Sequence, residues 1–170
     1  MNEVEDEEET FVIEPRVLKK RGRKRKAKQT DQIQFELDDE DLQVVSALCQ
    51  DSVLSGEDIS WQPKKGSLTL LLNRFRWEEK SLKPERVRSL LIIHDVTKVS
   101  SKAFSVNEKN KVYSLMSLKF EATDEIGGKL SIIFSNVSMI AASIECLNIK
   151  LQDVTRPYQA PSGNKPKHDE

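Results

Sequence analysis

Apolar and polar residues alternate along much of the chain, beginning near Ile33. A period of two is typical of strands that bury one face, and runs that are apolar at every position indicate strands buried on both faces. The segments that we predict as strands on this basis are 33–37, 59–61, 68–77, 86–96, 99–106, 112–121, 130–134 and 139–145. Within 112–121 we expect Met116, Leu118 and Phe120 to point into the core.

One segment near the start of this region has the period of a helix instead. Its apolar residues recur on one helical face, at Leu42, Val45, Leu48 and Cys49. Asp38 can serve as the N-cap, and the acidic residues after it suit the positive end of the helix dipole, so we predict a helix over 39–50. Because Cys49 lies on the apolar face, it is expected to be a small core residue rather than a nucleophile.

The segment 68–78 is the feature around which the predicted fold is organised. Its first half is apolar on both faces and indicates a buried central strand. We expect it to form a hairpin with the strand before it, in a register that places Trp61 near Leu68 and Ile59 near Leu70. Trp61 is then a core residue by default.

The second half of this segment alternates arginine with aromatic residues, as Arg74-Phe75-Arg76-Trp77. Alternate side chains of a strand share a face, so Arg74 and Arg76 should emerge together on a surface. Their spacing of about 7 Å would allow the two guanidinium groups to clasp one anion. Arg74, Arg76 and Trp77 are therefore the candidate ligand or partner surface.

Nearby acidic residues give a simpler explanation of the same arginines. Glu57, Asp58 or Glu78 could pair with them across the sheet, which is the usual arrangement on a β-surface that carries both signs of charge. Trp77 could equally be a core residue, the default for an aromatic residue on a leucine-rich strand. The sequence favours ion pairing over an anion site and leaves both open.

These elements predict an α+β fold of mainly antiparallel strands with one N-terminal helix. The sheet should be strongly curved, as a half-open barrel or as two packed β layers, and a pleckstrin-homology-like barrel is an analogy for it. The segment 147–154 fits a helix or a strand, and the alternation of Ile149 and Leu151 with polar residues favours the strand. We place this single domain at 31–155 and expect 156–170 to form a loose C-terminal tail.

Much of the charge of the chain is concentrated in residues 1–30, which we expect to be disordered. Residues 3–9 are mostly acidic, and residues 16–28 carry only basic charges. Nine basic and seven acidic residues within 1–28 give this tail a net charge of +2, and since the whole chain has −1, the remainder carries −3. Between the two blocks, the Phe-Val-Ile sequence at 11–13 is either a chance apolar island or part of a segment that docks on a sheet edge.

The basic block offers the only predicted route to nucleic acid, because the remainder of the chain is acidic. Its side chains could bind phosphate backbones through counterion release. They are Lys19, Lys20, Arg21, Arg23, Lys24, Arg25 and Lys26. The Arg-Gly-Arg triplet at 21–23 is similar to the minor-groove arm called an AT-hook, but Lys24 stands where a proline is expected. Nucleic-acid association through the tail is the alternative function.

Residue types that support catalysis are sparse. His94 and His168 are the only histidines, and His94 and Asp95 would point to opposite faces of a strand unless a bulge intervened. The only cysteines, Cys49 and Cys146, lie far apart among apolar residues. No phosphate loop, dinucleotide fingerprint or metal-ligand spacing is found. An enzyme that uses His94 or Cys146 is therefore the least favoured hypothesis.

Composition indicates a reducing, aqueous compartment. The isolated cysteines do not form a disulfide framework, no signal peptide opens the sequence, and the apolar runs are too short to span a membrane. We expect a cytoplasmic protein with no membrane contact and no cofactor. The first functional hypothesis is a non-enzymatic binding or adaptor protein with a protein partner.

The Asn-Arg-Phe-Arg-Trp-Glu motif at 73–78 resembles an uncharacterised family of alphaproteobacterial proteins, a domain of unknown function. The stretches 42–51, 56–64 and 145–147 support this resemblance, which covers about 35–169 and leaves out the charged tail. The resemblance implies a small bacterial cytoplasmic protein. It supplies no activity, cofactor or catalytic residue.

Overall fold

The computed structural model of the chain describes residues 32–36, 39–79, 83–105, 107–108, 110–123, 127–161 and 163. In this part of the chain, one 11-stranded, mostly antiparallel sheet is combined with one α-helix, which confirms the predicted fold class. The predicted disordered tail at 1–30, with its basic block and its apolar segment, lies outside the described residues, as does His168.

The sheet consists of two halves that are joined by one short strand. The first half-sheet contains β1 (Gln32–Glu36), β10 (Asn148–Asp153), β5 (Glu85–Ile93) and β4 (Ser67–Phe75), with β3 (Ile59–Gln62) on β4 and β11 (Tyr158–Gln159) on β5. The second half-sheet contains β7 (Val112–Ala122), β8 (Gly128–Phe134), β9 (Met139–Ile144) and β6 (Val96–Lys102). Strand β2 (Val53–Ser55), which the sequence did not predict, joins them because Val53 pairs with Asn73 of β4 and with Ser114 of β7.

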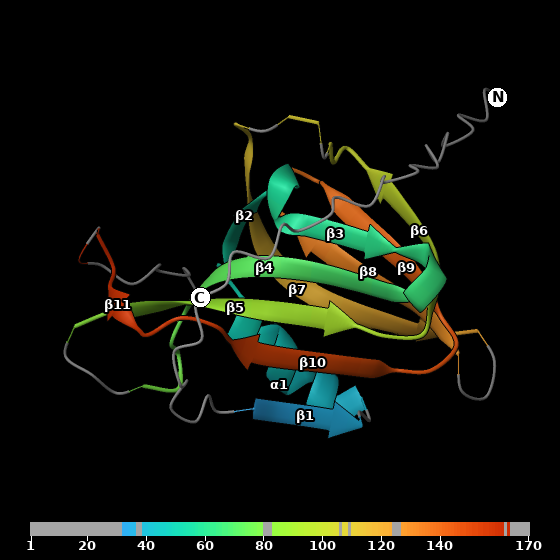
Figure 1. The fold of residues 1–170 in the computed structure, drawn as a ribbon, viewed down its shortest axis with the longest axis horizontal. Helices are drawn as coiled ribbons and strands as arrows, with labels where there is room; N and C mark the ends of the chain where they lie inside the picture. Colours follow the sequence, from blue (N-terminus) through green and yellow to red (C-terminus); the bar gives the residue numbers. More distant parts are fainter. Residues whose placement is uncertain are drawn as a thin grey trace, which may run out of the picture.

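The sheet is curved but not closed. Its strand order begins at β1 and ends at β6, and these two strands do not pair with each other in the described structure. Figure 1 shows β7, β8 and β9 behind β3, β4 and β5, so the two half-sheets form two layers. Helix α1 (Asp39–Cys49) lies behind β1 and β10 and contacts β7 and β4.

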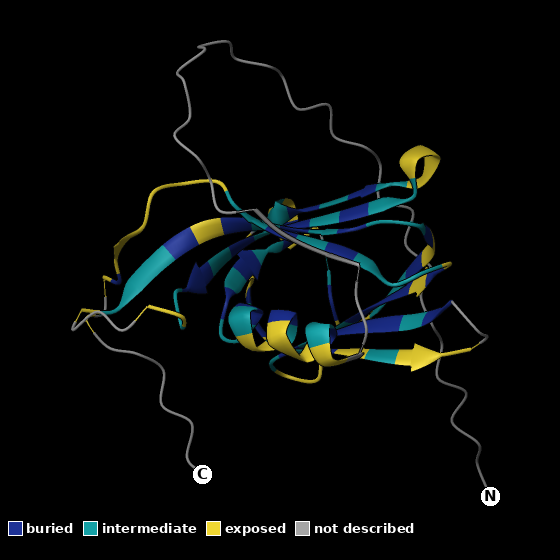
Figure 2. Cartoon of the chain, turned by 90° about the horizontal axis from the view of Figure 1, so that it is seen from below, coloured by how far each residue is buried: buried dark blue, intermediate teal, exposed yellow. Residues whose placement is uncertain are grey.

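The hydrophobic core lies between the two layers and the helix. Helix α1 turns Leu42, Val45 and Cys49 inward, and Figure 2 shows its exposed positions on the opposite side. The predicted helix over 39–50 is thus confirmed, and Cys49 is a core residue as expected. The hydroxyl of Ser46 accepts a hydrogen bond of 2.9 Å from the backbone N–H of Leu118, which ties the helix to β7.

The hairpin around which the fold was predicted forms in the expected register. Ile59 pairs with Leu70, and Trp61 pairs with Leu68. All four side chains are buried, so Trp61 is a core residue. Short 3-10 helices flank β3, η1 (Gly56–Asp58) before it and η2 (Pro63–Lys65) after it. The segment 147–154 contains β10, which confirms the favoured strand.

Two predicted strand boundaries are wrong because a turn interrupts the segment 86–96. Strand β5 ends at Ile93, and Asp95 adopts a left-handed conformation with φ of 56°. His94 and Asp95 therefore belong to the turn rather than to a strand. Strand β6 then spans Val96–Lys102 instead of 99–106.

Two further predictions fail for local reasons. A bulge lies between Leu115 and Ser117 of β7, and it shifts the inward phase so that Met116 is 39% exposed while Leu118 is buried. The C-terminal tail is not loose over its described part, since β11 pairs with β5 and Ala160 is buried. Among the described residues there is no helix of the length and apolar character that crossing a membrane requires.

Candidate functional site

Arg74 lies on the inner face of β4, not on a surface. Leu68, Leu70, Leu72 and Arg74 are buried at every second position of this strand, and Phe75 on the opposite face is buried as well. The same alternation that buries the leucines therefore carries Arg74 inward, and its side chain is only 2% exposed. The prediction that Arg74 emerges beside Arg76 on a surface is wrong.

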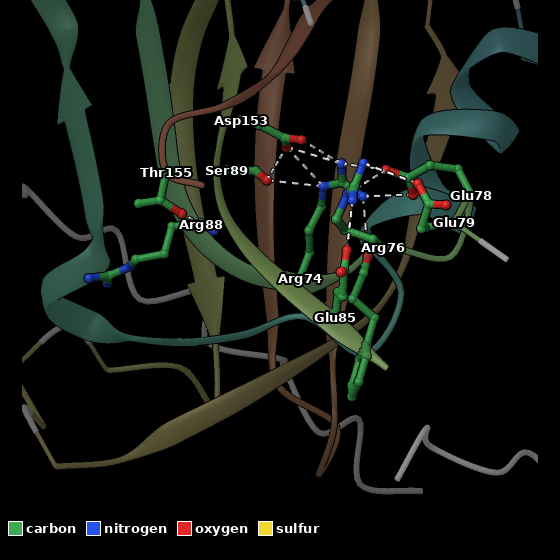
Figure 3. Close-up of polar contacts among 10 residues, drawn as sticks. Arg74, Arg76, Glu78, Glu79, Glu85, Arg88, Ser89, Asp153 and Thr155 are labelled. Atoms are coloured by element: carbon green, nitrogen blue, oxygen red, sulfur yellow. Dashed lines mark hydrogen bonds and ion pairs between the residues drawn. The ribbon is translucent and has the colours of Figure 1, made fainter. Parts of the chain in front are cut away.

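Acidic and hydroxyl groups surround the guanidinium of Arg74 (Figure 3). Its Nη2 donates to both carboxylate oxygens of Asp153 at 3.0 Å, and Nη1 and Nη2 donate to the two oxygens of Glu78 at 3.0 and 2.9 Å. Nε donates to the hydroxyl of Ser89 at 3.0 Å, and that hydroxyl donates to Asp153 at 2.6 Å. Nη1 also reaches the carbonyl of Phe75 at 3.2 Å. The buried cation is fully hydrogen-bonded, as burial requires.

This network ties three elements together at one end of the first half-sheet. Arg74 is on β4, Ser89 is on β5, and Asp153 is the last residue of β10. Glu78 lies in the turn after β4, so the same guanidinium also fixes the turn. Arg74, Glu78, Ser89 and Asp153 form a structural ion cluster, which we call the Arg74 cluster.

Arg76 and Trp77 are held by contacts of their own. Arg76 is 22% exposed and pairs with Glu85 at 2.8 Å and with Glu79 at 3.5 Å. The indole Nε1 of Trp77 donates to the carbonyl of Gln50 at 3.1 Å, just beyond the C-terminus of α1. The ion-pair explanation is thus confirmed for these arginines, with Glu78 as one of the acids.

Asp58 of η1, another acid considered as a partner of these arginines, has a different role. Asp58 accepts hydrogen bonds from the backbone and hydroxyl of Ser55, and its second oxygen lies 3.4 Å from the guanidinium of Arg88. The prediction that Asp58 pairs with Arg74 or Arg76 is wrong.

The electrostatics of the cluster exclude a simple anion clasp. Burial alone would lower the pKa of Arg74, but the hydrogen bonds that it donates to Glu78 and the charge of Asp153 raise this pKa above its ordinary value. Burial likewise disfavours ionised Glu78, yet its hydrogen bonds with Arg74 lower its pKa below the ordinary value. Four carboxylates therefore face two guanidinium groups, and the carboxylates already occupy the positions that an anion would take.

The opposite face of the same strand end carries a second pair of arginines. Val87 and Ser89 of β5 are buried, so Arg86 and Arg88, which alternate with them, point outward. The guanidinium carbon of Arg86 lies 3.8 Å from the centre of the Phe75 ring, and its Nη1 donates to the carbonyl of Asn73 at 2.9 Å. Arg88 is 47% exposed and points away from the Arg74 cluster (Figure 3).

An apolar centre adjoins these arginines on the outward side of the first half-sheet. Leu71 pairs with Leu90, Thr69 pairs with Ile92, and Ile92 also pairs with Lys150. All five are only partly buried. In Figure 1 this side faces the viewer, and no described helix or strand lies in front of β4, β5 and β10.

We call this surface the outer face, defined by Thr69, Leu71, Arg88, Leu90, Ile92 and Lys150. It was not identified from the sequence. The signal was available, because Arg86 and Arg88 alternate with Val87 as Arg74 and Arg76 alternate with Phe75. The two pairs of arginines differ in their phase relative to the buried positions of their strands. Arg74 is in step with the buried leucines of its strand, whereas Arg88 is out of step with its own buried neighbours.

Neither thiol in the structure is arranged for nucleophilic chemistry. Complete burial raises the pKa of Cys49 to about 12. Cys146 donates from Sγ to Asp95 at 3.2 Å, and this bond, with some desolvation, raises its pKa as well. The described residues contain no group of three or more His, Cys, Asp or Glu side chains that could hold a metal ion. The basic residues at 19–26 lie outside the described part of the chain.

A family model described as "Protein of unknown function (DUF2948)" matches residues 35–168, which include both faces of the strand end. The chain belongs to the DUF2948 family. The match begins after the charged tail, so the outer face and the Arg74 cluster lie in the family region and the basic block does not. A search of the curated proteins finds no match, and a search of the solved structures finds none either.

Proposed function

We propose that this DUF2948 protein is a small, cytoplasmic, non-enzymatic binding or adaptor protein, and that it binds a protein partner on the outer face. The observation that carries the proposal is the composition of that face. Leu71, Leu90 and Ile92 form an apolar centre on a sheet surface that no described helix or strand covers, and Arg88 and Lys150 flank it. An apolar centre within a polar rim is the usual anatomy of a protein interface.

The neighbouring aromatic and arginine residues strengthen this proposal. Arg86 and Tyr158 stand side by side in one cross-strand row, and Arg86 lies over the ring of Phe75, which is buried. The Tyr158 hydroxyl donates to the side chain of Asn73 at 2.7 Å, which holds the ring in place. Tyrosine and arginine are enriched among the residues that dominate binding energy, and preorganised side chains lose less entropy on binding.

The chemistry of the charged and sulfur groups supports a non-enzymatic role. The guanidinium of Arg74 is already paired with Glu78 and Asp153, and both thiols have raised pKa values that keep them protonated near neutral pH. Two free cysteines also suit a reducing compartment such as the cytoplasm.

The proposal can be tested by comparing two charge-reversal variants of the full chain. Arg88→Glu with Lys150→Glu changes the outer face, and Lys98→Glu with Lys119→Glu makes the same charge change on exposed positions of the second half-sheet. Each variant is used to capture proteins from an extract of the source cells, and each captured protein is then purified and its binding measured by calorimetry. We expect a directly binding protein that is retained by the wild type and the control variant and loses at least about tenfold in affinity with the outer-face variant.

Direct binding that is equal for both variants would contradict the proposed surface. Capture that disappears after nuclease treatment, and after deletion of residues 19–26, would support the nucleic-acid alternative instead.

A further inference from the structure

The N-terminal segment joins the described fold at β1, beside the outer face. Gln32, the first residue of β1, pairs with Gln152 of β10. Gln152 pairs in turn with Leu90 of β5, which pairs with Leu71 of β4. The chain therefore enters the sheet in the same cross-strand row as the apolar centre of the outer face. Three strand spacings of about 4.8 Å, or about 14 Å, separate the entry point from Leu71.

The composition of this segment complements the outer face in both charge and polarity. Residues 3–9 contain six acidic side chains, and the apolar Phe-Val-Ile sequence at 11–13 follows almost at once. The outer face offers the matching arrangement, with Leu71, Leu90 and Ile92 at its centre and two cations beside them. Lys150 has no ion-pair partner among the described residues, and Arg88 has one exposed pair, with Asp58 at 3.4 Å.

We propose that residues 3–13 dock on the outer face and act as an internal competitor for its partner. Phe11, Val12 and Ile13 cover the apolar centre, and the acidic side chains face Arg88 and Lys150. The basic residues at 16–28 do not fit this face, because its cations would repel them. They serve instead as the connection back to β1.

The connection is long enough for this return. From Ile13 to Gln32 the chain runs through 19 peptide units. A flexible chain of that length has a root-mean-square end-to-end distance of about 24 Å, which exceeds the separation of about 14 Å across the sheet. Tethering of this kind corresponds to an effective concentration near the millimolar range. Weak docking would therefore be sufficient to occupy the face most of the time.

This inference rests on the proposed role of the outer face as a binding surface, but its test has a separate readout. A nitroxide is attached at Thr10→Cys in the full chain, with Cys146→Ser to remove the other accessible thiol. Cys49 stays unlabelled because it is completely buried. We expect the label to broaden the methyl resonances of Leu71, Leu90 and Ile92. The methyl of Met116, which is exposed on the second half-sheet, should stay sharp.

Matched variants decide whether the broadening reports the proposed contact. It should disappear with Arg88→Glu and Lys150→Glu, and it should persist with Lys98→Glu and Lys119→Glu. Sharp outer-face methyls in the labelled wild type would overturn the inference, and so would broadening confined to β1, which would indicate docking on the sheet edge. Broadening in a mixture of spin-labelled and separately isotope-labelled protein would also overturn it, because the segment would then contact a second copy.

Competition gives the functional readout. A synthetic peptide of residues 1–15 should bind the full-chain variant Phe11→Ser, Val12→Ser, Ile13→Ser about tenfold more tightly than it binds the wild type. Equal affinity would overturn the internal competition. If a partner is lost from the outer-face variant while the methyls stay sharp, the proposed function stands and only this inference fails.

Discussion

Arg74 and Arg88 occupy the same end of the first half-sheet on neighbouring strands, yet they face opposite sides of it (Figure 3). Arg74 is 2% exposed and engages two carboxylates, a hydroxyl and a carbonyl. Arg88 is 47% exposed and has one ion pair at 3.4 Å. The same residue type therefore has a structural role on one face and stays largely exposed on the other.

The difference shows how the size of an arginine's contribution to stability depends on its surroundings. A buried ion cluster need not be more stabilising than a well-packed apolar one, but removing one member leaves uncompensated charges. An exposed pair is screened by solvent and contributes little. The predictions below separate the two faces on this basis.

The largest expected change in the free energy of unfolding comes from a substitution on the inner face. Arg74→Ala leaves Asp153 and Glu78 without their cation beside the core, and it should lower the free energy of unfolding by about 3–5 kcal/mol. Equilibrium urea unfolding measures this change. Because so large a loss could abolish folding, Arg74→Met with Asp153→Leu is measured alongside and should be more stable than Arg74→Ala. A loss below about 1 kcal/mol for Arg74→Ala would show that the cluster is not structural.

An intermediate effect is expected for Arg86. This side chain covers the ring of Phe75 and donates to the carbonyl of Asn73, so it acts through packing as well as charge. Arg86→Ala should cost about 1–2 kcal/mol in urea unfolding. Arg86→Lys should recover part of this loss, and a lysine variant no better than alanine would argue against the cation–π contact.

A smaller effect should appear in the pH dependence of stability. The pKa of Glu78 is lowered in the folded protein, so ionised Glu78 favours folding. That contribution is complete above the unfolded pKa, about 4.3, and is lost as the pH falls through the lower folded value. Glu78→Gln should therefore lower stability at pH 7 and flatten the decline below about pH 4.3. The change should stay within about 1 kcal/mol because Glu78 is 40% exposed. If the stability of Glu78→Gln declined below about pH 4.3 as steeply as that of the wild type, the pairing of Glu78 with Arg74 would be contradicted.

The smallest effect on stability is expected on the outer face. Arg88→Ala should change the free energy of unfolding by no more than about 0.5 kcal/mol, since its pair with Asp58 is exposed. Thermal and urea unfolding both test this. A loss of 2 kcal/mol or more would mean that Arg88 is a structural residue and would remove it from the proposed binding surface.

Much of the fold follows from the sequence because strand and helix periods are local properties. The hairpin register, the helix and the strand at 147–154 were all predicted from the spacing of apolar residues. Met116 was misplaced because a bulge of one residue reverses the phase of a strand without any sequence marker. Strand β11 was missed because its pairing with β5 compensates for a composition rich in turn residues.

The site was predicted less well than the fold, for a related reason. Arg74 and Arg76 were assigned to a surface by residue type, although Arg74 is in phase with the buried leucines of β4. Its main acidic partner, Asp153, is 79 residues away in the sequence, so no local pattern could identify the pair. Arg88 on β5 alternates out of phase with the buried positions of its strand, and this marks it as exposed. Phase relative to the buried positions is therefore a more informative criterion than residue type.

The most direct test of the difference between the two faces keeps both positive charges and removes only the guanidinium geometry. Arg74→Lys and Arg88→Lys are compared by urea unfolding under identical conditions. Lysine cannot reproduce the simultaneous contacts of Arg74 with Ser89, Asp153 and Glu78. We therefore predict a loss of about 2 kcal/mol for Arg74→Lys and a change within about 0.5 kcal/mol for Arg88→Lys. Equal losses for the two variants would contradict the account.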